Sequence, residues 1–172
     1  GGMALPKSGS NGAGLDWMRR LGHHVVPVVP ALCPLLLADD QPSSAAARLR
    51  ELSGITVDAR LALVAASGRR LWETTDSLLF THFGLSGPAA MNLSRHWARA
   101  QAESPDDPPS LALGHPYLPT GEMADAWLLQ NARTHPHQPV GQGLRRLWPE
   151  RLALLLAGAA AETPLGRLTR DH

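Results

Sequence analysis

Ser86 lies in a glycine turn, GLSGP at residues 84–88, which is the kind of setting in which hydrolases expose a nucleophile. A nucleophile elbow requires the pattern G-x-S-x-G, because the strained turn between strand and helix leaves no room for side chains beside the serine. Here Pro88 stands where the second glycine belongs, and no spacing of the later histidines and acids selects partners for a catalytic triad. A simpler interpretation makes Ser86 or Gly87 the N-cap of a helix, with Pro88 in its first turn.

Two other patterns could indicate a functional site, one for a metal and one for a phosphate, and both are weak. The chain has eight histidines, but only His135 and His137 resemble a zinc-binding pair, and no cysteine lies near them. The polarity of their loop explains that pair better, so we predict no metal site. The segment GSNGAG at 9–14 resembles a phosphate-binding loop, but its glycines run in the reverse order of the dinucleotide-binding fingerprint and no strand precedes it.

The clearest element that could position such residues is a strand at 55–64. Its alternating apolar positions are Ile55, Val57, Ala59, Leu61 and Leu63. A period of two is typical of a strand with one buried face. The segment SGRR at 67–70 favours a hairpin turn, followed by one or more returning strands up to Phe83. We expect a helix from Pro88 to about Ala100 and a further short extended segment at 111–119.

The flanking regions differ from this β region. Leu15, Met18 and Leu21 recur at helical spacing, and Gly22 is placed to end that helix. Residues 24–37 are rich in β-branched side chains but are interrupted by prolines, which predicts edge strands or a bulged strand. After residue 120 the periodicity is helical, with Pro149 at the first position of a helix. The sequence therefore predicts a small β unit with one inserted helix, followed by a helical unit.

Charge and composition narrow the class of protein. Lys and Arg number 16 against 15 Asp and Glu, and the basic pairs are scattered, so we expect no nucleic-acid partner. The single cysteine, Cys33, fits a reducing compartment and predicts a cytoplasmic protein. The apolar run at 25–38 is cut by prolines and is too short to span a bilayer, so we expect no membrane partner. The chain starts with two glycines and no methionine, as expected of a segment of a longer protein.

Three longer stretches of the sequence, taken together, indicate a particular protein family. They are GGMALPKSGSNGAG with LGHHVVPVVPALCPL, then SLLFTHFGLSGPAAMNLS, and finally LWPERLALLL. In this order and spacing they resemble the central part of the BaiN-type NAD(P)/FAD-dependent oxidoreductases, a flavoprotein family that includes the aminoacetone-oxidase-like enzymes. The resemblance covers nearly all 172 residues. It implies an α+β insert domain of a Rossmann-like flavoprotein.

The resemblance divides the chain into three ranges. Residues 1–23 would comprise the end of the FAD-binding domain with a loop and a helix. Residues 24–119 would form a small β-barrel with an inserted helix, and residues 120–172 a helical subdomain. The insert would cap the flavin.

The resemblance also implies roles for particular residues. Those on the cofactor side are Gly1, Gly2, Lys7, Gly9 and Ser10. The two initial glycines match the end of a strand next to the dinucleotide, and the others belong to a loop that runs over the cofactor, where the family commonly has Asp in place of Asn11. In the signature LLFTHFGLSGP, the residues Thr81, His82 and Gly87 would either line the substrate cavity or fix how the barrel docks on the FAD-binding domain. The resemblance assigns no catalytic residue.

For the whole protein, the resemblance implies hydride transfer between NAD(P)H, FAD and a small organic molecule, either an enone or an amine. The partner of this segment would be the FAD-binding domain of the same parent chain. The family places its glycine-rich flavin motifs outside the insert, so the segment alone is expected to bind FAD poorly and to be inactive. The competing class is a non-enzymatic β-barrel and helical module that binds another protein.

Overall fold

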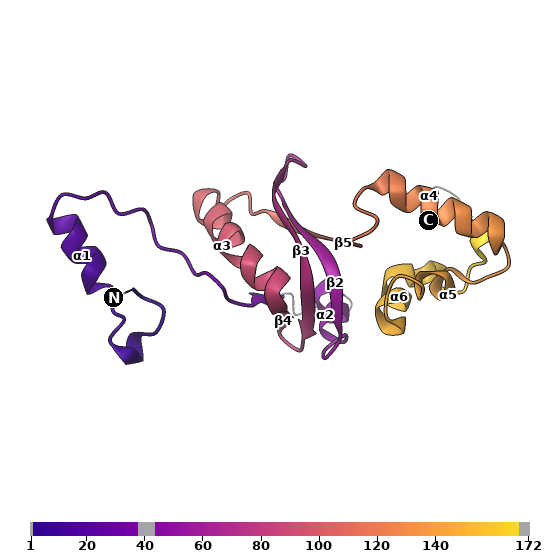
Figure 1. The fold of residues 1–172 in the computed structure, drawn as a ribbon, viewed down its shortest axis with the longest axis horizontal. Coiled ribbons are helices and arrows are strands. Elements are labelled where there is room, and N and C mark those ends of the chain that lie inside the picture. The colour runs from indigo at the N-terminus through magenta and orange to yellow at the C-terminus, as the bar shows by residue number, and fades with distance from the viewer. Residues whose placement is uncertain (1, 38–43, 169–172) are drawn as a thin grey trace.

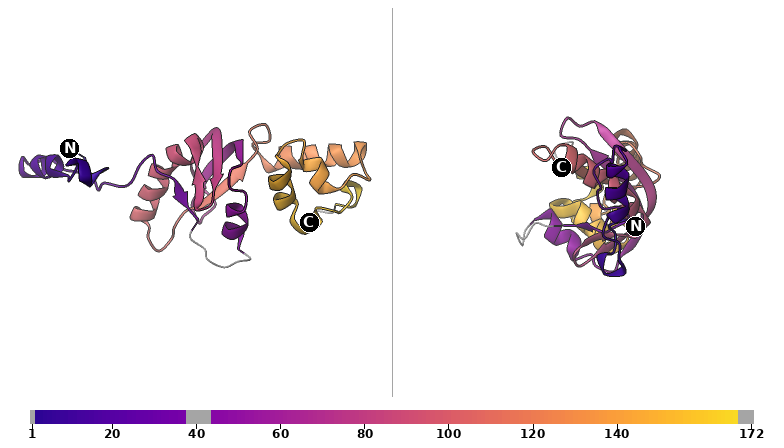
Figure 2. Two further views of the ribbon diagram at one scale, coloured as in Figure 1. Left: turned by 90° about the horizontal axis from the view of Figure 1, so that it is seen from below. Right: turned by 90° about the vertical axis from the view of Figure 1, so that its left-hand side faces the viewer.

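The computed structural model describes residues 2–37 and 44–168 and confirms the α+β class. An N-terminal segment with α1, a central sheet with α3, and a group of C-terminal helices follow one another along the long axis (Figures 1 and 2). The α-helices are α1 (Ala13–Arg20), α2 (Ala45–Arg50), α3 (Gly87–Glu103), α4 (Gly121–Thr134), α5 (Val140–Leu144) and α6 (Glu150–Ala157). Short 3₁₀ turns are η1 (Pro6–Ser8), η2 (Gly158–Ala160) and η3 (Leu165–Arg167). The domain limits at residues 23 and 119 stay a prediction.

The sheet is antiparallel and curls into a half-barrel. Its strands are β1 (Leu35–Leu36), β2 (Thr56–Val64), β3 (Arg70–Thr81), β4 (Gly84–Ser86) and β5 (Ser110–Gly114). They lie in the order β1-β4-β3-β2-β5, so β1 and β5 form the two edges. The predicted strand and hairpin are confirmed, because Val57 pairs with Leu78 and Leu61 with Thr74 across the β2–β3 turn. The predicted extended segment after residue 110 is β5, which pairs with β2.

The proline-containing stretch before β1 is extended, as predicted, but little of it joins the sheet. Only Leu35 and Leu36 pair with β4, and the Leu37 N–H adds a bond to the Phe83 carbonyl oxygen at 3.1 Å. Prolines lack the N–H that a ladder needs, which explains why pairing starts after the last of them. Val28 is 52% exposed and Leu32 is 62% exposed.

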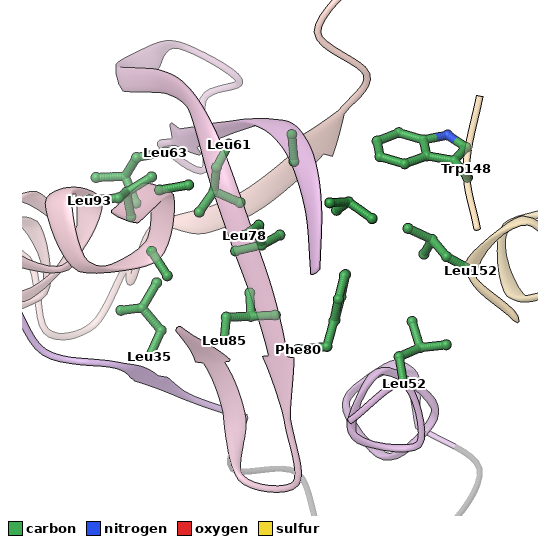
Figure 3. Close-up of a cluster of buried hydrophobic side chains, with 14 of the residues drawn as sticks. Leu35, Leu52, Leu61, Leu63, Leu78, Phe80, Leu85, Leu93, Trp148 and Leu152 are labelled. Atoms are coloured by element: carbon green, nitrogen blue, oxygen red, sulfur yellow. The ribbon is translucent and has the colours of Figure 1, made fainter. Parts of the chain in front are cut away.

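The core lies where α3 packs on the concave side of the sheet. Leu93 of α3 and Leu61, Leu78 and Leu85 of the strands are all at most 5% exposed. Figure 3 shows Leu93 beside the β-strand leucines. Burying side chains of this size stabilises a fold by about 1.5–3 kcal/mol each. The predicted helix at 88–100 is confirmed and extends slightly further at both ends.

The C-terminal helical unit, α4 to α6 with η2 and η3, contributes Trp148, Leu152 and Ala153 to the same core. Trp148 is only 7% exposed, and its ring meets the ring of His115 edge to face at 4.8 Å between centroids. The Arg60 guanidinium also donates to the Pro119 carbonyl oxygen, and that of Arg151 donates to the carbonyl oxygen of Glu51. These contacts join the helical unit to the sheet.

Inside the helical unit, one buried polar residue links two helices. Asn131 of α4 is 7% exposed and accepts a hydrogen bond from the Arg146 guanidinium at 2.8 Å. Its amide donates to the Trp127 carbonyl oxygen at 2.8 Å, so both ends of the side chain are satisfied. Pro149 is the N-cap of α6 rather than its first residue, because its backbone is still extended at ψ 145.

The N-terminal segment packs on nothing in the described chain. The helix α1 is confirmed, and Gly22 ends it as predicted, with φ 85 and a His23 N–H that donates to the Met18 carbonyl oxygen at 3.0 Å. No residue of α1 is buried. Trp17 is 64% exposed and Leu21 is 71% exposed. Figure 1 shows this segment at the end of the molecule opposite the helical unit.

Candidate functional site

The turn between β3 and β4 carries two of the predicted site residues, Thr81 and His82. The Thr81 hydroxyl donates to the Gly84 carbonyl oxygen at 2.8 Å and accepts the Gly84 N–H at 3.0 Å. The hydroxyl proton is therefore used to close the turn. His82 is exposed, and its ring meets that of Phe83 edge to face at 5.0 Å. Among the described residues, His82 makes no hydrogen bond or ion pair.

Gly87 explains why α3 begins directly where β4 ends. Its φ is +84, and a Cβ added there would lie 2.9 Å from the Ser77 carbonyl oxygen and 3.0 Å from the Leu79 nitrogen. Only glycine allows the helix start to lie this close to β3. Ser86 is the N-cap, as predicted, but its side chain makes no capping hydrogen bond, and Pro88 lies in the first turn.

Further along α3, His96 has an unusual environment. Its ring stacks on that of Trp72 of β3, with centroids 4.4 Å apart and an interplanar angle of 19°. The Arg95 guanidinium donates to His96 Nε2 at 3.2 Å. Burial first, and the Arg95 charge second, lower the pKa of His96 from 6.5. Sequence spacing could not reveal this pair, because its members come from different elements.

The predicted cofactor-side residues lie in the loop before α1, with one exception. Gly2, Lys7 and Gly9 are exposed and Ser10 is half-buried, whereas Gly1 lies outside the described residues. The Gly12 N–H donates to the Gly2 carbonyl oxygen at 3.0 Å, which closes the loop. A Cβ at Gly2 or Gly9 would meet nothing within 4 Å. The backbone of this loop is therefore open to a large ligand.

The structure does not bring the two groups of predicted residues together. An extended stretch, residues 23–34, separates the N-terminal loop from the sheet, and the loop lies at one end of the molecule (Figure 1). A site that uses both groups therefore requires protein from outside this chain.

A feature that the sequence analysis did not predict is a cavity at the open side of the half-barrel. Its volume is about 630 Å³, and its lining includes Cys33, Ser94 and Trp97 among many leucines. The only sequence feature related to this cavity was the long apolar, proline-rich stretch before β1. That stretch predicted an extended segment but did not predict a cavity beside it.

Two searches of the described ranges gave negative results. Within residues 2–37 and 44–168, no three His, Cys, Asp or Glu side chains come together as a group that could hold a metal ion. In the same ranges, no helix has both the length and the apolar character needed to cross a bilayer.

A curled antiparallel sheet with one long helix, preceded by an open loop and followed by a helical unit, defines a barrel-and-helix domain. The comparison with family models gives the same class. The model described as "HI0933-like protein barrel and H2TH domain" matches residues 29–171. The chain therefore belongs to the HI0933-like family, which is the family of the BaiN-type flavoprotein oxidoreductases, and the predicted resemblance is confirmed.

Curated relatives carry two kinds of name. The chain is 31% identical over 157 residues to the 3-dehydro-bile acid delta(4,6)-reductase of Clostridium scindens, covering 88% of this chain and 35% of the relative. It is 29% identical over 152 residues to the ribosomal RNA dihydrouridine synthase of Escherichia coli, covering 88% and 33%. The Haemophilus influenzae protein of the same name is 26% identical over 155 residues, covering 90% and 33%. The chain thus spans about a third of each relative.

Proposed function

We propose that the whole protein is an FAD-dependent oxidoreductase that moves hydride from NAD(P)H to a small organic substrate, and that this segment is the insert that caps the flavin. The observation that carries the proposal is the family match over residues 29–171. The names of the relatives support a finer statement. A delta(4,6)-reductase and a dihydrouridine synthase both describe products with a carbon–carbon double bond reduced. We therefore propose a conjugated carbon–carbon double bond as the group that is reduced.

The exposed N-terminal segment supports the proposed partner. Trp17, Met18 and Leu21 lie on one side of α1 and are 64%, 41% and 71% exposed, while Asp16 and Arg19 lie on the other side. An uncovered apolar helix face in contact with water is unfavourable in a finished protein. We propose that the FAD-binding domain of the same parent chain covers it.

The open N-terminal loop fits a dinucleotide. Gly2 and Gly9 present backbone without side chains, and Lys7 provides a positive charge that suits a pyrophosphate. We propose these residues, with Ser10, for FAD binding. When bound, the flavin would supply a two-electron carrier that accepts and donates hydride. The protein would orient the substrate and exclude water.

On the substrate side, the three candidates from the signature LLFTHFGLSGP differ in whether they already have a role within the chain. Thr81 closes its own turn, and Gly87 seats α3 on β3. His82 is the member whose side chain is free to reach a neighbouring domain or a substrate, so we propose His82 as the substrate-side residue. The alternative class, a protein-binding module without flavin, would leave His82 and α1 as contacts with another protein.

A small molecule is the substrate class that the charges favour. The basic pair of the helical unit is used internally, because Arg145 pairs with Glu150 at 2.6 Å and Arg146 donates to Asn131 at 2.8 Å. Nucleic-acid binding depends on cations that are free to meet phosphates. The 16 Lys and Arg of the chain are scattered and are balanced by 15 Asp and Glu. We therefore propose an enone-type small molecule and no nucleic-acid partner, in a cytoplasmic protein.

The experiment is anaerobic reduction of the purified whole protein. We expect bound FAD to lose its absorbance on addition of NADH or NADPH and to regain it when a 3-keto-4-ene steroid is added. A ribosomal RNA fragment serves as the second acceptor. Recovery with the RNA alone would overturn the small-molecule part of the proposal, and a protein without flavin would overturn the whole.

Gly2→Val tests the cofactor-side assignment. The described chain leaves open space at Gly2, so added side-chain atoms clash only with a ligand or domain outside it. We expect FAD content to fall while the chain itself stays folded. Gly121→Val is the matched control, because a Cβ there also meets nothing within 4 Å. Normal FAD content in Gly2→Val would remove this residue from the site.

A further inference from the structure

The cavity at the open side of the half-barrel is partly open to solvent and is lined by residues from all five strands and from α2 and α3. Leu36 of β1, Leu113 of β5 and Trp97 of α3 contribute to its walls. The two strands are the opposite edges of the sheet and do not pair with each other. The cavity therefore lies at the seam where a complete barrel would be closed.

The size and lining of the cavity indicate the chemistry of an occupant. Its volume of about 630 Å³ lies within the range of about 300–1,000 Å³ that is usual for small-molecule sites. Among the described residues, those that line the cavity include no Lys, Arg, His, Asp or Glu. A charged ligand would lose its hydration there without gaining a counter-charge, which is costly.

The buried hydroxyl of Ser94 is a polar group in this otherwise apolar lining. Ser94 is 1% exposed, its hydroxyl donates to the Met91 carbonyl oxygen at 2.8 Å, and it accepts the Cys33 N–H at 3.2 Å. A hydroxyl oxygen has two acceptor positions, so one stays available to a ligand hydroxyl or amine. The Cys33 thiol lies in the same lining and can report on occupancy.

The cavity is partly open to solvent, so its apolar lining meets water when nothing is bound. Contact between water and an apolar surface of this size is unfavourable, and an apolar ligand would remove it. We propose that the cavity binds an uncharged lipophilic small molecule with at most one hydroxyl or amine group. This site is independent of the proposed hydride transfer, because it requires no flavin.

The test uses the whole flavin-loaded protein and two probes with one skeleton. N-phenyl-1-naphthylamine is uncharged and carries one N–H, and 1-anilinonaphthalene-8-sulfonate adds a negative charge. By calorimetry we expect one equivalent of the uncharged probe to bind, and the sulfonate to bind at least about tenfold more weakly. Equal affinity for both probes would overturn the proposal, since a general sticky surface would not discriminate between them.

Two variants locate the binding. Ala98 lines the cavity on α3, so Ala98→Phe should fill part of it and weaken the uncharged probe by about tenfold or more. Ala102→Phe is the matched control, because it places the same side chain on an exposed position of the same helix, outside the lining. An equal loss in both variants, or no loss in Ala98→Phe, would contradict the site.

A measurement on the unchanged protein keeps the test valid if Ala98→Phe does not fold. Saturating N-phenyl-1-naphthylamine should slow alkylation of Cys33 several-fold, followed by mass spectrometry of the peptide that contains it. Alkylation at the same rate with and without the probe would place the probe elsewhere and overturn the proposal.

Discussion

At the scale of single residues, neighbouring side chains of the signature LLFTHFGLSGP have different roles in the structure. The glycine turn around Ser86 raised the question of a nucleophile, yet the Ser86 side chain does not even make a capping hydrogen bond. The Thr81 hydroxyl, from the same signature, makes two hydrogen bonds with Gly84 that close the β3–β4 turn. A motif shows which residue types are adjacent, but hydrogen bonding depends on where the turn directs each side chain.

His96 gives a prediction at this scale. Its pKa is lowered in the folded protein, so below pH 6.5 the unfolded chain takes up a proton that the folded chain still resists. The free energy of unfolding should therefore decrease as pH falls through about 6.5, and should stop decreasing below the folded pKa. Denaturant unfolding at a series of pH values measures this. His96→Phe keeps a ring on Trp72 without the titrating group and should flatten the slope. An identical slope in both proteins would show that His96 is not its source.

At the scale of elements, the local sequence pattern predicted where strands occur better than it predicted which strands pair. The alternation in β2 is strong because every second residue from Val57 to Leu63 is buried, and the structure confirms it. The other face is exposed only at Thr56 and Asp58, and Ala62 on that face is buried. The stretch before β1 was predicted to be extended, but nothing local specified that only Leu35 and Leu36 pair. Pairing depends on the approach of β4, where a Cβ on Gly84 would clash with the Leu35 carbonyl oxygen.

The junction between β4 and α3 gives the second prediction. Gly87→Ala must adopt a left-handed backbone, which costs about 1–2 kcal/mol, and must also push against β3, which adds about 1–3 kcal/mol. Gly68→Ala is the control, because its φ of +81 is similar but its Cβ meets nothing within 4 Å. Gly87→Ala should therefore lower the free energy of unfolding more than Gly68→Ala does. Equal losses in a chemical denaturation experiment would mean that the close approach to β3 costs nothing.

At the scale of the whole molecule, the sequence predicted the order of the parts and the α+β class, and the structure confirms both. The cavity and the bare α1 face could not be predicted, because each depends on how distant segments meet or fail to meet. Leu21 shows this clearly, since its helical spacing with Leu15 and Met18 indicates an inward-facing residue and yet it is 71% exposed in this chain.

The exposed α1 face gives a prediction for the whole protein. If the FAD-binding domain covers Trp17, Trp17→Gln should lower the free energy of unfolding by about 2–3 kcal/mol, because it removes a large buried apolar side chain. Arg19→Gln, on the opposite side of the same helix, should change it by less than about 0.5 kcal/mol. Thermal or denaturant unfolding of the full-length protein makes the comparison. Two equally small effects would leave α1 exposed in the complete protein and favour the alternative, a module that binds another protein.

The sequential order of β2, β3, β4 and α3 has a consequence for how the chain acquires its shape during synthesis. These elements follow one another and pack on their immediate predecessors, so the loops that must close are short. The strand β5 pairs with β2 only after α3 has intervened, and no residue of α1 is buried within the described chain. The middle of this segment should therefore become ordered before either of its ends.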